Sequence, residues 1–151
     1  MATIPLPTEF KEFLRLLNSN DVEYLLVGGF CVLYYGYPRA TGDIDVWIDT
    51  SKKNAVKVSK SLVEFGFDEA HVSPQLIRRK HKVFRMGVPP LQIDILTDVS
   101  GLTFKACYER RAVANIDGVE VSIISLKDLR KNKRASGRHK DLDDLDNLPE
   151  K

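Results

Sequence analysis

Three aspartates occupy positions from which their carboxylates could share one site. Asp43 and Asp45 are two residues apart in the alternating run DIDVWID. On a strand, both side chains would leave the same face, with Cβ atoms about 7 Å apart. The segment LQIDIL, residues 91–96, alternates in the same way and puts Asp94 on one face of a second strand. If the two strands are neighbours, about 4.8 Å apart, Asp94 joins the pair.

Carboxylates this close together favour cation chemistry. They repel one another, by roughly 3 kcal/mol per pair at about 6 Å and an effective dielectric constant of about 20, so they need compensating positive charge. Oxygen ligands of this kind select hard cations such as Mg²⁺ or Mn²⁺. Such ions, held in pairs, serve phosphoryl and nucleotidyl transfer. A lone Asp-x-Asp pair is equally typical of a solvated strand surface, so the neighbouring residues must distinguish the two cases.

A glycine pair lies upstream of the aspartates. Gly28-Gly29 follows the β-prone run 22–27 and precedes FCVLYYGY, for which we expect a short buried helix. Backbone N–H groups at a strand-to-helix turn can bind a phosphate, although a tight turn alone would also require glycine. Arg39 and Thr41 come just before Asp43 and are expected at the rim of the same site, where a guanidinium could bind phosphate oxygens.

The rest of the pattern predicts the elements that position these residues. Strands are expected at 22–27, 43–49, 83–86, 91–96, 112–116 and 119–124, and the last two flank the hairpin signal Asp117-Gly118. Helical spacing is expected at 10–17, 51–65, 74–79 and 125–135, and in a last short helix that carries Leu142, Leu145 and Leu148. This order predicts an α/β (α+β) protein, with helices packed on a single mixed β-sheet.

Composition narrows the class of protein. The 151 residues, 43% hydrophobic and 29% charged, suit one globular domain over 1–151, with 125–148 as a C-terminal helical extension. The longest uncharged stretch, 24–38, is shorter than the roughly 20 residues of a membrane-spanning helix. The N-terminus lacks a secretory signal pattern, and Cys31 and Cys107 are too few for a disulfide framework or a zinc site. We therefore expect a cytoplasmic protein without a membrane segment.

The C-terminal segment has a sharp charge reversal. Seven lysines and arginines lie within 127–140, and four aspartates follow within 141–146. If the basic helix faces the carboxylates, Lys133 or Lys140 could hold a triphosphate and the others could attract a nucleic acid, whereas a solvated helix face would give the same pattern. Trp47 shares the face of Asp43 and Asp45; it could stack on a base, but it is expected to pack under a helix.

The string VGGFCVLYYGYPRATGDIDVWID, residues 27–49, resembles the core motif of the DNA polymerase beta-type nucleotidyltransferase superfamily, and Asp94 matches the third carboxylate of that motif. Its GYPRATGDID portion is similar to small prokaryotic members, including the nucleotidyltransferase toxins of type IV toxin-antitoxin systems. The string NKRASGRHKDLDDLDNL, residues 132–148, resembles their closing motif and adds Lys133, Lys140 and Asp141 as candidates. One departure is Gly29, where many active members have serine.

This resemblance implies a nucleotidyltransferase-like fold and an enzyme that moves an NMP from an NTP to an acceptor hydroxyl, with release of pyrophosphate. The acceptor could belong to tRNA, a protein or a small molecule, and the protein could be a toxin with an antitoxin partner. The implied metal ligands for two Mg²⁺ ions, or Mn²⁺, are Asp43, Asp45 and Asp94. The candidate nucleotide-binding residues are Gly28, Gly29, Arg39, Thr41, Lys133, Lys140 and Asp141.

Two alternatives remain open from the sequence. The chain could be a catalytically inactive nucleotide-binding or protein-interaction module with the same fold, which Gly29 and the short C-terminal segment would suit. The same carboxylates could also serve metal-dependent phosphodiester hydrolysis. Retention of three mutually repelling carboxylates favours nucleotidyl transfer over a binding module, because a binder has no need to maintain them.

Overall fold

A six-stranded mixed sheet forms the centre of the molecule. The computed structural model describes residues 4–38, 42–88 and 90–150. The strands lie in the order β3-β4-β2-β1-β6-β5. Their bounds are β1 Tyr24–Val27, β2 Asp43–Ile48, β3 Val83–Val88, β4 Leu91–Leu96, β5 Ala112–Ile116 and β6 Val119–Ile123. Strand β2 is antiparallel to β1 and parallel to β4, so the predicted mixed sheet with packed helices is confirmed.

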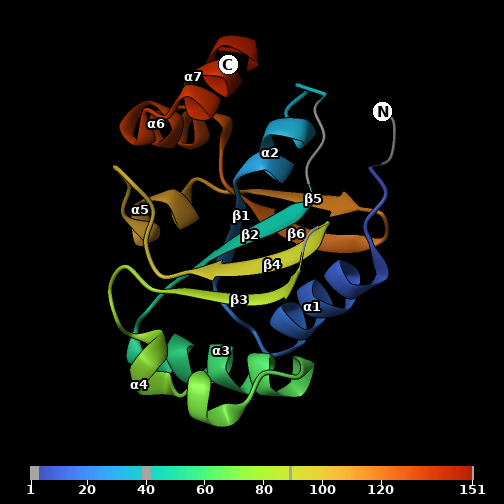
Figure 1. Cartoon of the computed structure of the whole chain (residues 1–151), viewed down its shortest axis with the longest axis vertical. Coiled ribbons are helices and arrows are strands. Elements are labelled where there is room, and N and C mark those ends of the chain that lie inside the picture. The colour runs from blue at the N-terminus through green and yellow to red at the C-terminus, as the bar shows by residue number, and fades with distance from the viewer. Residues whose placement is uncertain (1–3, 39–41, 89, 151) are drawn as a thin grey trace.

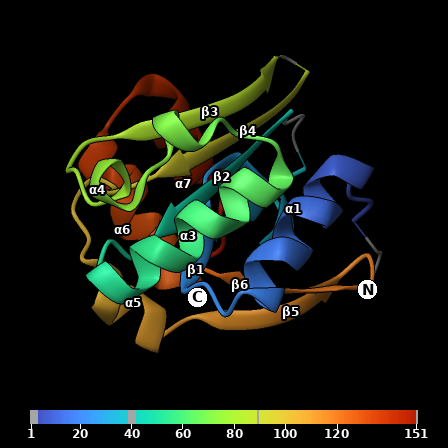
Figure 2. The same cartoon turned by 90° about the horizontal axis from the view of Figure 1, so that it is seen from below.

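Helices cover both faces of this sheet. Their bounds are α1 Thr8–Ser19, α2 Gly29–Tyr34, α3 Lys52–Phe65, α4 Pro74–Ile77, α5 Phe104–Glu109, α6 Leu126–Ser136 and α7 His139–Asn147, with a short 3₁₀ turn at Glu69–His71. Helices α1, α3 and α4 lie on one side, whereas α2, α6 and α7 lie on the other (Figure 1). Figure 2 shows α1, α3 and α4 in front of the strands when the molecule is seen from below. One face of the sheet is therefore left for α6 and α7.

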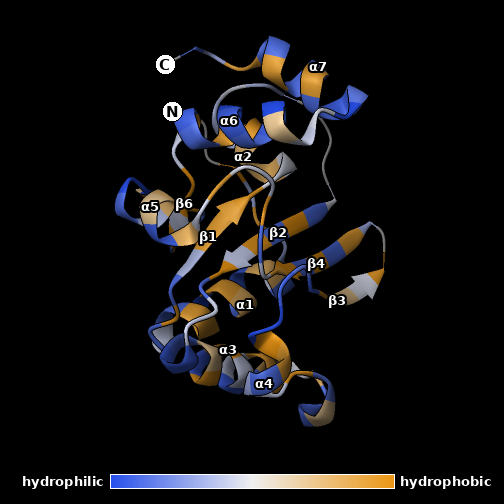
Figure 3. Cartoon of the chain, turned by 90° about the vertical axis from the view of Figure 1, so that its left-hand side faces the viewer, coloured by the Kyte–Doolittle hydropathy of each residue, from blue (hydrophilic) through white to orange (hydrophobic). Residues whose placement is uncertain are grey.

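The two faces of β2 have different roles. Ile44, Val46 and Ile48 are buried on the face toward α1 and α3. Helix α1 contributes Phe10, Phe13, Leu14 and Leu17 to this core, and α3 contributes Ala55, Val58 and Leu62. Both helices carry hydrophobic and hydrophilic bands in Figure 3, as expected for helices with one packed face. Asp43, Asp45 and Trp47 consequently point to the opposite face, toward α6 and α7.

Local signals in the sequence account for the boundaries of these elements. The side chain of Ser125 accepts a hydrogen bond from the backbone N–H of Asp128, which caps α6. Gly137 ends that helix in the left-handed region, with φ of 64°. Asp117 and Gly118 both have positive φ and join β5 to β6, which confirms the predicted hairpin. The first and last residues of α6 are thus set by its own capping residues.

Across the described part of the chain, none of the helices has the length and apolar character needed to cross a membrane. Cys31 and Cys107 are both buried free thiols.

Candidate active site

Strands β2 and β4 bring the three predicted aspartates together. Their parallel register pairs Asp45 with Asp94 and Asp43 with Gln92. Residues paired in this way point to the same face of the sheet, so the three carboxylates lie on one surface, as predicted. All three line a cavity of about 560 Å³, whose other walls include Gly28 and residues of α6 and α7. The condition under which Asp94 joins the pair, that the two strands are neighbours, is met.

Gly28 fits closely against the carboxylate of Asp45. Val27, at the end of β1, pairs with Asp45, so the turn that follows lies beside that side chain. Gly28 has a φ of 75°, and a Cβ atom at this position would overlap the carboxylate of Asp45. Glycine is therefore required here twice, once for the backbone conformation and once for space. Gly29 is the first residue of α2. The predicted Arg39 and Thr41 fall outside the described residues.

The two predicted lysines have different surroundings. Lys140 is exposed and lines the cavity. Lys133 is 4% exposed, and its Nζ lies 3.3 Å from Asp141 Oδ1 and 2.9 Å from Asp144 Oδ2. This ammonium therefore joins α6 to two buried carboxylates of α7. Lys133 and Asp141 both line the cavity, but the observed contacts of Lys133 are with protein carboxylates.

Arg138 was part of the basic run but was not singled out in the sequence. Its Nε donates to Asp141 Oδ2 at 2.7 Å, and its Nη2 lies 3.3 Å from Asp141 Oδ1. Burial alone would raise the pKa of Asp141, but the hydrogen bond from Arg138 and the charge of Lys133 outweigh it and lower that pKa. Asp141 is thus held ionised between two cations, at the wall of the cavity.

Arg85 and Gln92 were missed in the sequence, and both bind Asp94. Arg85 Nε lies 2.8 Å from Asp94 Oδ1 and its Nη2 lies 3.3 Å from Oδ2, while Gln92 Nε2 lies 3.2 Å from each oxygen. Arg85 faces Asp94 across the antiparallel pair β3 and β4. One signal was available: 83–88 and 91–96 flank a short connection, and a tight hairpin would pair residue 85 with residue 94.

The surroundings of Asp45 in the site change the pKa of its carboxyl group. Burial raises its pKa to about 6, and the neighbouring carboxylates of Asp94 and Asp43 contribute to this rise. The positive charges of Lys140 and Lys133 act in the opposite direction. The centre of the cavity therefore concentrates negative charge that nearby lysines compensate only in part, which favours the approach of cations.

The aspartates fit a divalent cation by ligand type and by position. Carboxylate oxygens on one sheet face, next to a cavity with cationic walls, are the ligands that Mg²⁺ shares with phosphates. Within 4–38, 42–88 and 90–150, however, no group of three or more His, Cys, Asp or Glu side chains is close enough to hold an ion as it stands. Asp94 contacts Arg85 and Gln92 instead. The donor set is present, but the ligand shell is not preformed.

A glycine turn lies against an Asp-x-Asp strand, with a third aspartate on the neighbouring parallel strand of a mixed sheet, which is the arrangement that the resemblance of residues 27–49 to nucleotidyltransferases implies. The chain belongs to the family described as "Nucleotidyltransferase of unknown function (DUF6036)", whose model matches residues 6–148. This confirms the superfamily that the motif at 27–49 predicted. None of the curated proteins compared with the chain matches it.

Two solved structures resemble the fold over most of its length. A protein from Thermotoga maritima described as a nucleotidyltransferase (TM1012) is 14% identical, with a TM-score of 0.60 over 91% of this chain and 88% of that one. An antigenic nucleotidyltransferase-like protein from Paracoccidioides brasiliensis is 16% identical, with a TM-score of 0.54 over 95% of this chain and 77% of that one. At these identities the likeness concerns the fold.

Proposed function

We propose that this protein transfers a nucleoside monophosphate from an NTP to an acceptor hydroxyl and releases pyrophosphate. The observation that carries the proposal is the juxtaposition of Gly28, Asp45 and Asp94 at one cavity, with Lys140 in its wall. Gly28 allows the backbone to approach a triphosphate closely, because no side chain intervenes. Membership of a nucleotidyltransferase family supports the same reaction.

Asp43, Asp45 and Asp94 would hold the two divalent ions. When bound, Mg²⁺ would neutralise the triphosphate and make the acceptor hydroxyl a better nucleophile. Arg85 and Gln92 hold the Asp94 carboxylate in place at the wall of the cavity. The acceptor oxygen forms a bond to the α-phosphorus, the bond from that phosphorus to the pyrophosphate oxygen breaks, and the hydroxyl proton passes to Asp94 or to water.

The cationic wall would bind the nucleotide. Lys140 is exposed in the cavity and can reach a phosphate without breaking a buried ion pair. Lys133 and Asp141 would act by holding α6 and α7 in place around the triphosphate, together with Arg138. Arg39 and Thr41 are proposed at the rim on sequence grounds alone. We expect the reaction to take place in the cytoplasm, where NTP and Mg²⁺ are plentiful.

Pyrophosphate release tests the proposed reaction directly. The protein is incubated with each of the four α-labelled NTPs, with and without Mg²⁺, in the presence of RNA and protein pools. We expect Mg²⁺-dependent release, lowered roughly 100- to 1,000-fold in Asp45→Asn, on the scale of losing one charge contact in the transition state. Asp146→Asn, an exposed residue of α7 outside the cavity, is the matched control and should keep full release.

The alternative functions are distinguished by titration with NTP and by a nucleic-acid cleavage assay, run beside the pyrophosphate measurement. Metal-dependent NTP binding in isothermal titration without pyrophosphate release would favour a nucleotide-binding module. Cleavage of nucleic acid without NTP would favour phosphodiester hydrolysis. No NTP binding at all, with or without Mg²⁺, would contradict the proposed function.

A toxin role would act through this same site. We propose that, if expression of the chain slows growth, the effect depends on Asp45 and is relieved by co-expression of an antitoxin partner. Growth arrest by the native chain but not by Asp45→Asn would support this role. Equal arrest by both would contradict it.

A further inference from the structure

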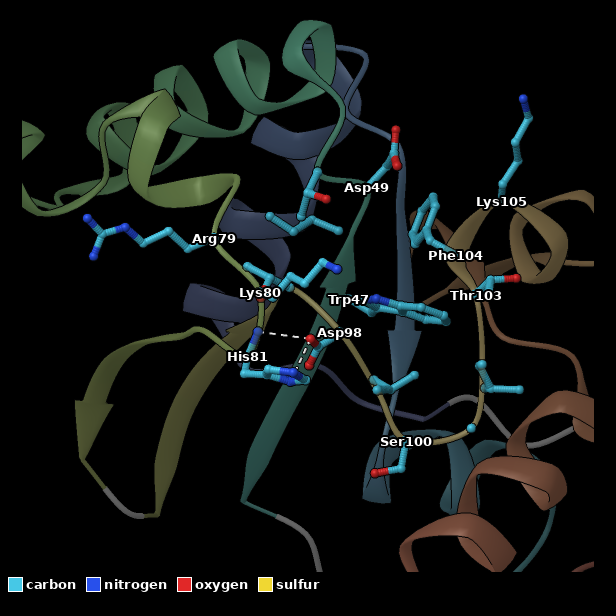
Figure 4. A pocket seen from close by; sticks show the side chains of 16 residues that line it. Trp47, Asp49, Arg79, Lys80, His81, Asp98, Ser100, Thr103, Phe104 and Lys105 are labelled. Carbon is cyan, nitrogen blue, oxygen red and sulfur yellow. Dashed lines mark hydrogen bonds and ion pairs between the residues drawn. The ribbon is translucent and has the colours of Figure 1, made fainter.

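A second cavity, of about 680 Å³, adjoins the carboxylate site. It lies beyond the ends of β2 and β4 and is closed by the start of α5, as Figure 4 shows. Asp98, Val99 and Ser100 line both cavities, so the two lie side by side along the loop after β4. The volume is within the usual range for sites that bind small molecules.

The lining of this second cavity carries an excess of positive charge. Lys80, Arg79 and Lys105 contribute three cations, against the carboxylates of Asp49 and Asp98. Asp98 is already engaged, because its Oδ2 lies 2.8 Å from His81 Nδ1 and also accepts from the backbone N–H of His81. In Figure 4 Lys80 extends toward Trp47, whereas Arg79 and Lys105 extend outward from opposite rims. An anion would be favoured near Lys80.

Aromatic groups form the other part of the wall. The ring of Phe104 is partly buried, meets Trp47 edge to face at 5.1 Å and stacks on Tyr108 at 5.4 Å. Trp47 is 1% exposed, which confirms that it packs under a helix. Its indole N–H has no hydrogen-bond partner within the described ranges. Because this N–H is itself buried, the partly buried ring of Phe104 is the aromatic group that a ligand in the cavity would contact.

The second cavity and the Gly28 turn lie on different sides of Asp45. Asp43, Asp45 and Trp47 follow one another on the same face of β2, at intervals of about 7 Å. Gly28 lies beside Asp45 on the β1 side, whereas the second cavity lies beyond Trp47 and on the β4 side. In a phosphoryl transfer the attacking and leaving oxygens are roughly in line on opposite sides of the phosphorus. A triphosphate at the Gly28 turn would leave the second cavity to the acceptor.

We propose that this second cavity binds the acceptor, and that the acceptor has the chemistry of a nucleotide: a ring that lies against Phe104 and a phosphate that contacts Lys80. Two sources share this chemistry, a free nucleotide and the end of a single-stranded RNA. The assignment of the cavity as an acceptor site rests on the proposed nucleotidyl transfer. The binding of a phosphorylated ring rests on the lining residues alone.

Trp47 provides a specific signal for the test, because it is the single tryptophan of the chain. The full chain is titrated with AMP, with adenosine and with a short single-stranded oligoadenylate RNA, each with and without a non-hydrolysable NTP and Mg²⁺. Tryptophan fluorescence reports occupancy, and anisotropy of labelled RNA gives its affinity. We expect AMP or the RNA to change the fluorescence, and adenosine to bind at least about tenfold more weakly because it lacks the phosphate.

Matched charge reversals locate the binding site. Lys80→Glu should weaken binding of the phosphorylated ligand by about tenfold or more. Lys60→Glu, an exposed position on α3 across the sheet, makes the same change in net charge and should bind as the native chain does. Metal-dependent NTP affinity, measured by isothermal titration, should stay within about threefold in Lys80→Glu, because the triphosphate lies in the other cavity.

Each outcome decides a different point. Binding of AMP alone identifies a free nucleotide as the source, and binding of the RNA alone identifies an RNA end. The proposal is overturned if neither binds, if adenosine binds as well as AMP, or if Lys80→Glu behaves like Lys60→Glu. Loss of NTP binding in Lys80→Glu would assign the cavity to the donor nucleotide instead. Failure of the proposed function would show separately, as absence of NTP binding by the native chain.

Discussion

Gly28 and Asp45 are packed so closely that residue 28 has no room for a side chain, since a Cβ atom there would overlap the Asp45 carboxylate. Gly28 directly follows β1, and Asp45 lies on the neighbouring antiparallel strand β2. The turn therefore limits how Asp45 can orient, and Asp45 limits what the turn can contain. This contact links the two halves of the sequence motif, which lie 17 residues apart.

Replacement of Gly28 by alanine should lower the free energy of unfolding by more than the backbone conformation of residue 28 alone explains. A left-handed backbone alone costs alanine about 1–2 kcal/mol, which Gly118→Ala should show, because Gly118 has a φ of 85° and open space around it. Gly28→Ala should lower the free energy of unfolding further and weaken Mg²⁺-dependent NTP binding, because the Asp45 carboxylate must move. Urea unfolding and isothermal titration compare the two variants. Equal loss of stability, with NTP binding intact, would contradict the steric explanation.

Arg85→Gln should increase the response of the protein to Mg²⁺. Arg85 makes two contacts with the Asp94 carboxylate, so its removal leaves the carboxylates with less positive charge and a greater gain from a cation. We expect a lower melting temperature without metal and a larger upward shift on addition of Mg²⁺. Arg15→Gln, an exposed change on α1, is the control. A shift no larger than that of the control would show that Arg85 does not compete for Asp94.

Substitutions of Lys133 and Lys140 should have different effects, the first on stability and the second on nucleotide binding. Lys133→Met leaves the buried carboxylates of Asp141 and Asp144 without their shared cation, so we expect a loss of about 3–5 kcal/mol in the free energy of unfolding. Lys140→Met, at an exposed position, should change stability by less than about 0.5 kcal/mol. It should nevertheless weaken NTP binding by about tenfold. Denaturant unfolding and titration measure both effects, and the reverse assignment would refute this division of roles.

Asp128 should make stability depend on acid pH. Burial would raise its pKa, but hydrogen bonds from Arg110 and Ser125 outweigh burial and lower it below the usual value of 3.8. The folded state therefore binds fewer protons than the unfolded state, so this stabilisation is complete above pH 3.8 and disappears as the pH falls through the lowered pKa.

The variant Asp128→Asn isolates this contribution. At pH 7 it should lower the free energy of unfolding by about 1.5–3 kcal/mol, the range for hydrogen bonds to a charged group. The difference from the native chain should become smaller in urea titrations carried out below pH 3.8, the usual value for this carboxyl group. A difference that stays constant between pH 7 and acid pH would mean that ionisation of Asp128 does not contribute.

Short-range patterns predicted most of the fold. Alternation in DIDVWID and LQIDIL identified β2 and β4, and Asp117-Gly118 identified the hairpin of β5 and β6. Ser125 and Gly137 gave the limits of α6. These predictions succeeded because capping, turn geometry and side-chain period act over a few residues, and a sequence displays such distances directly.

The candidate site was predicted in part. The aspartates and Gly28 were found because a spaced motif carries them, and the structure places them at one cavity. Arg85 and Gln92 were missed, because their contacts with Asp94 depend on strand pairing that a single segment does not specify. Lys133 was singled out, but its buried ion pairs with α7 could not be foreseen, because a charge run is equally consistent with a solvated face.

The sequence by itself determined which residue types could do chemistry and on which face of its own strand each would lie. It also determined where most helices begin and end. Only the tertiary structure decided the partners: Asp45 beside Asp94, Arg85 on Asp94, Lys133 between Asp141 and Asp144, and a second cavity that shares Asp98 with the first. The physical reason is that strand order, register and helix packing are set by the burial of the whole core, to which each local segment contributes only a part.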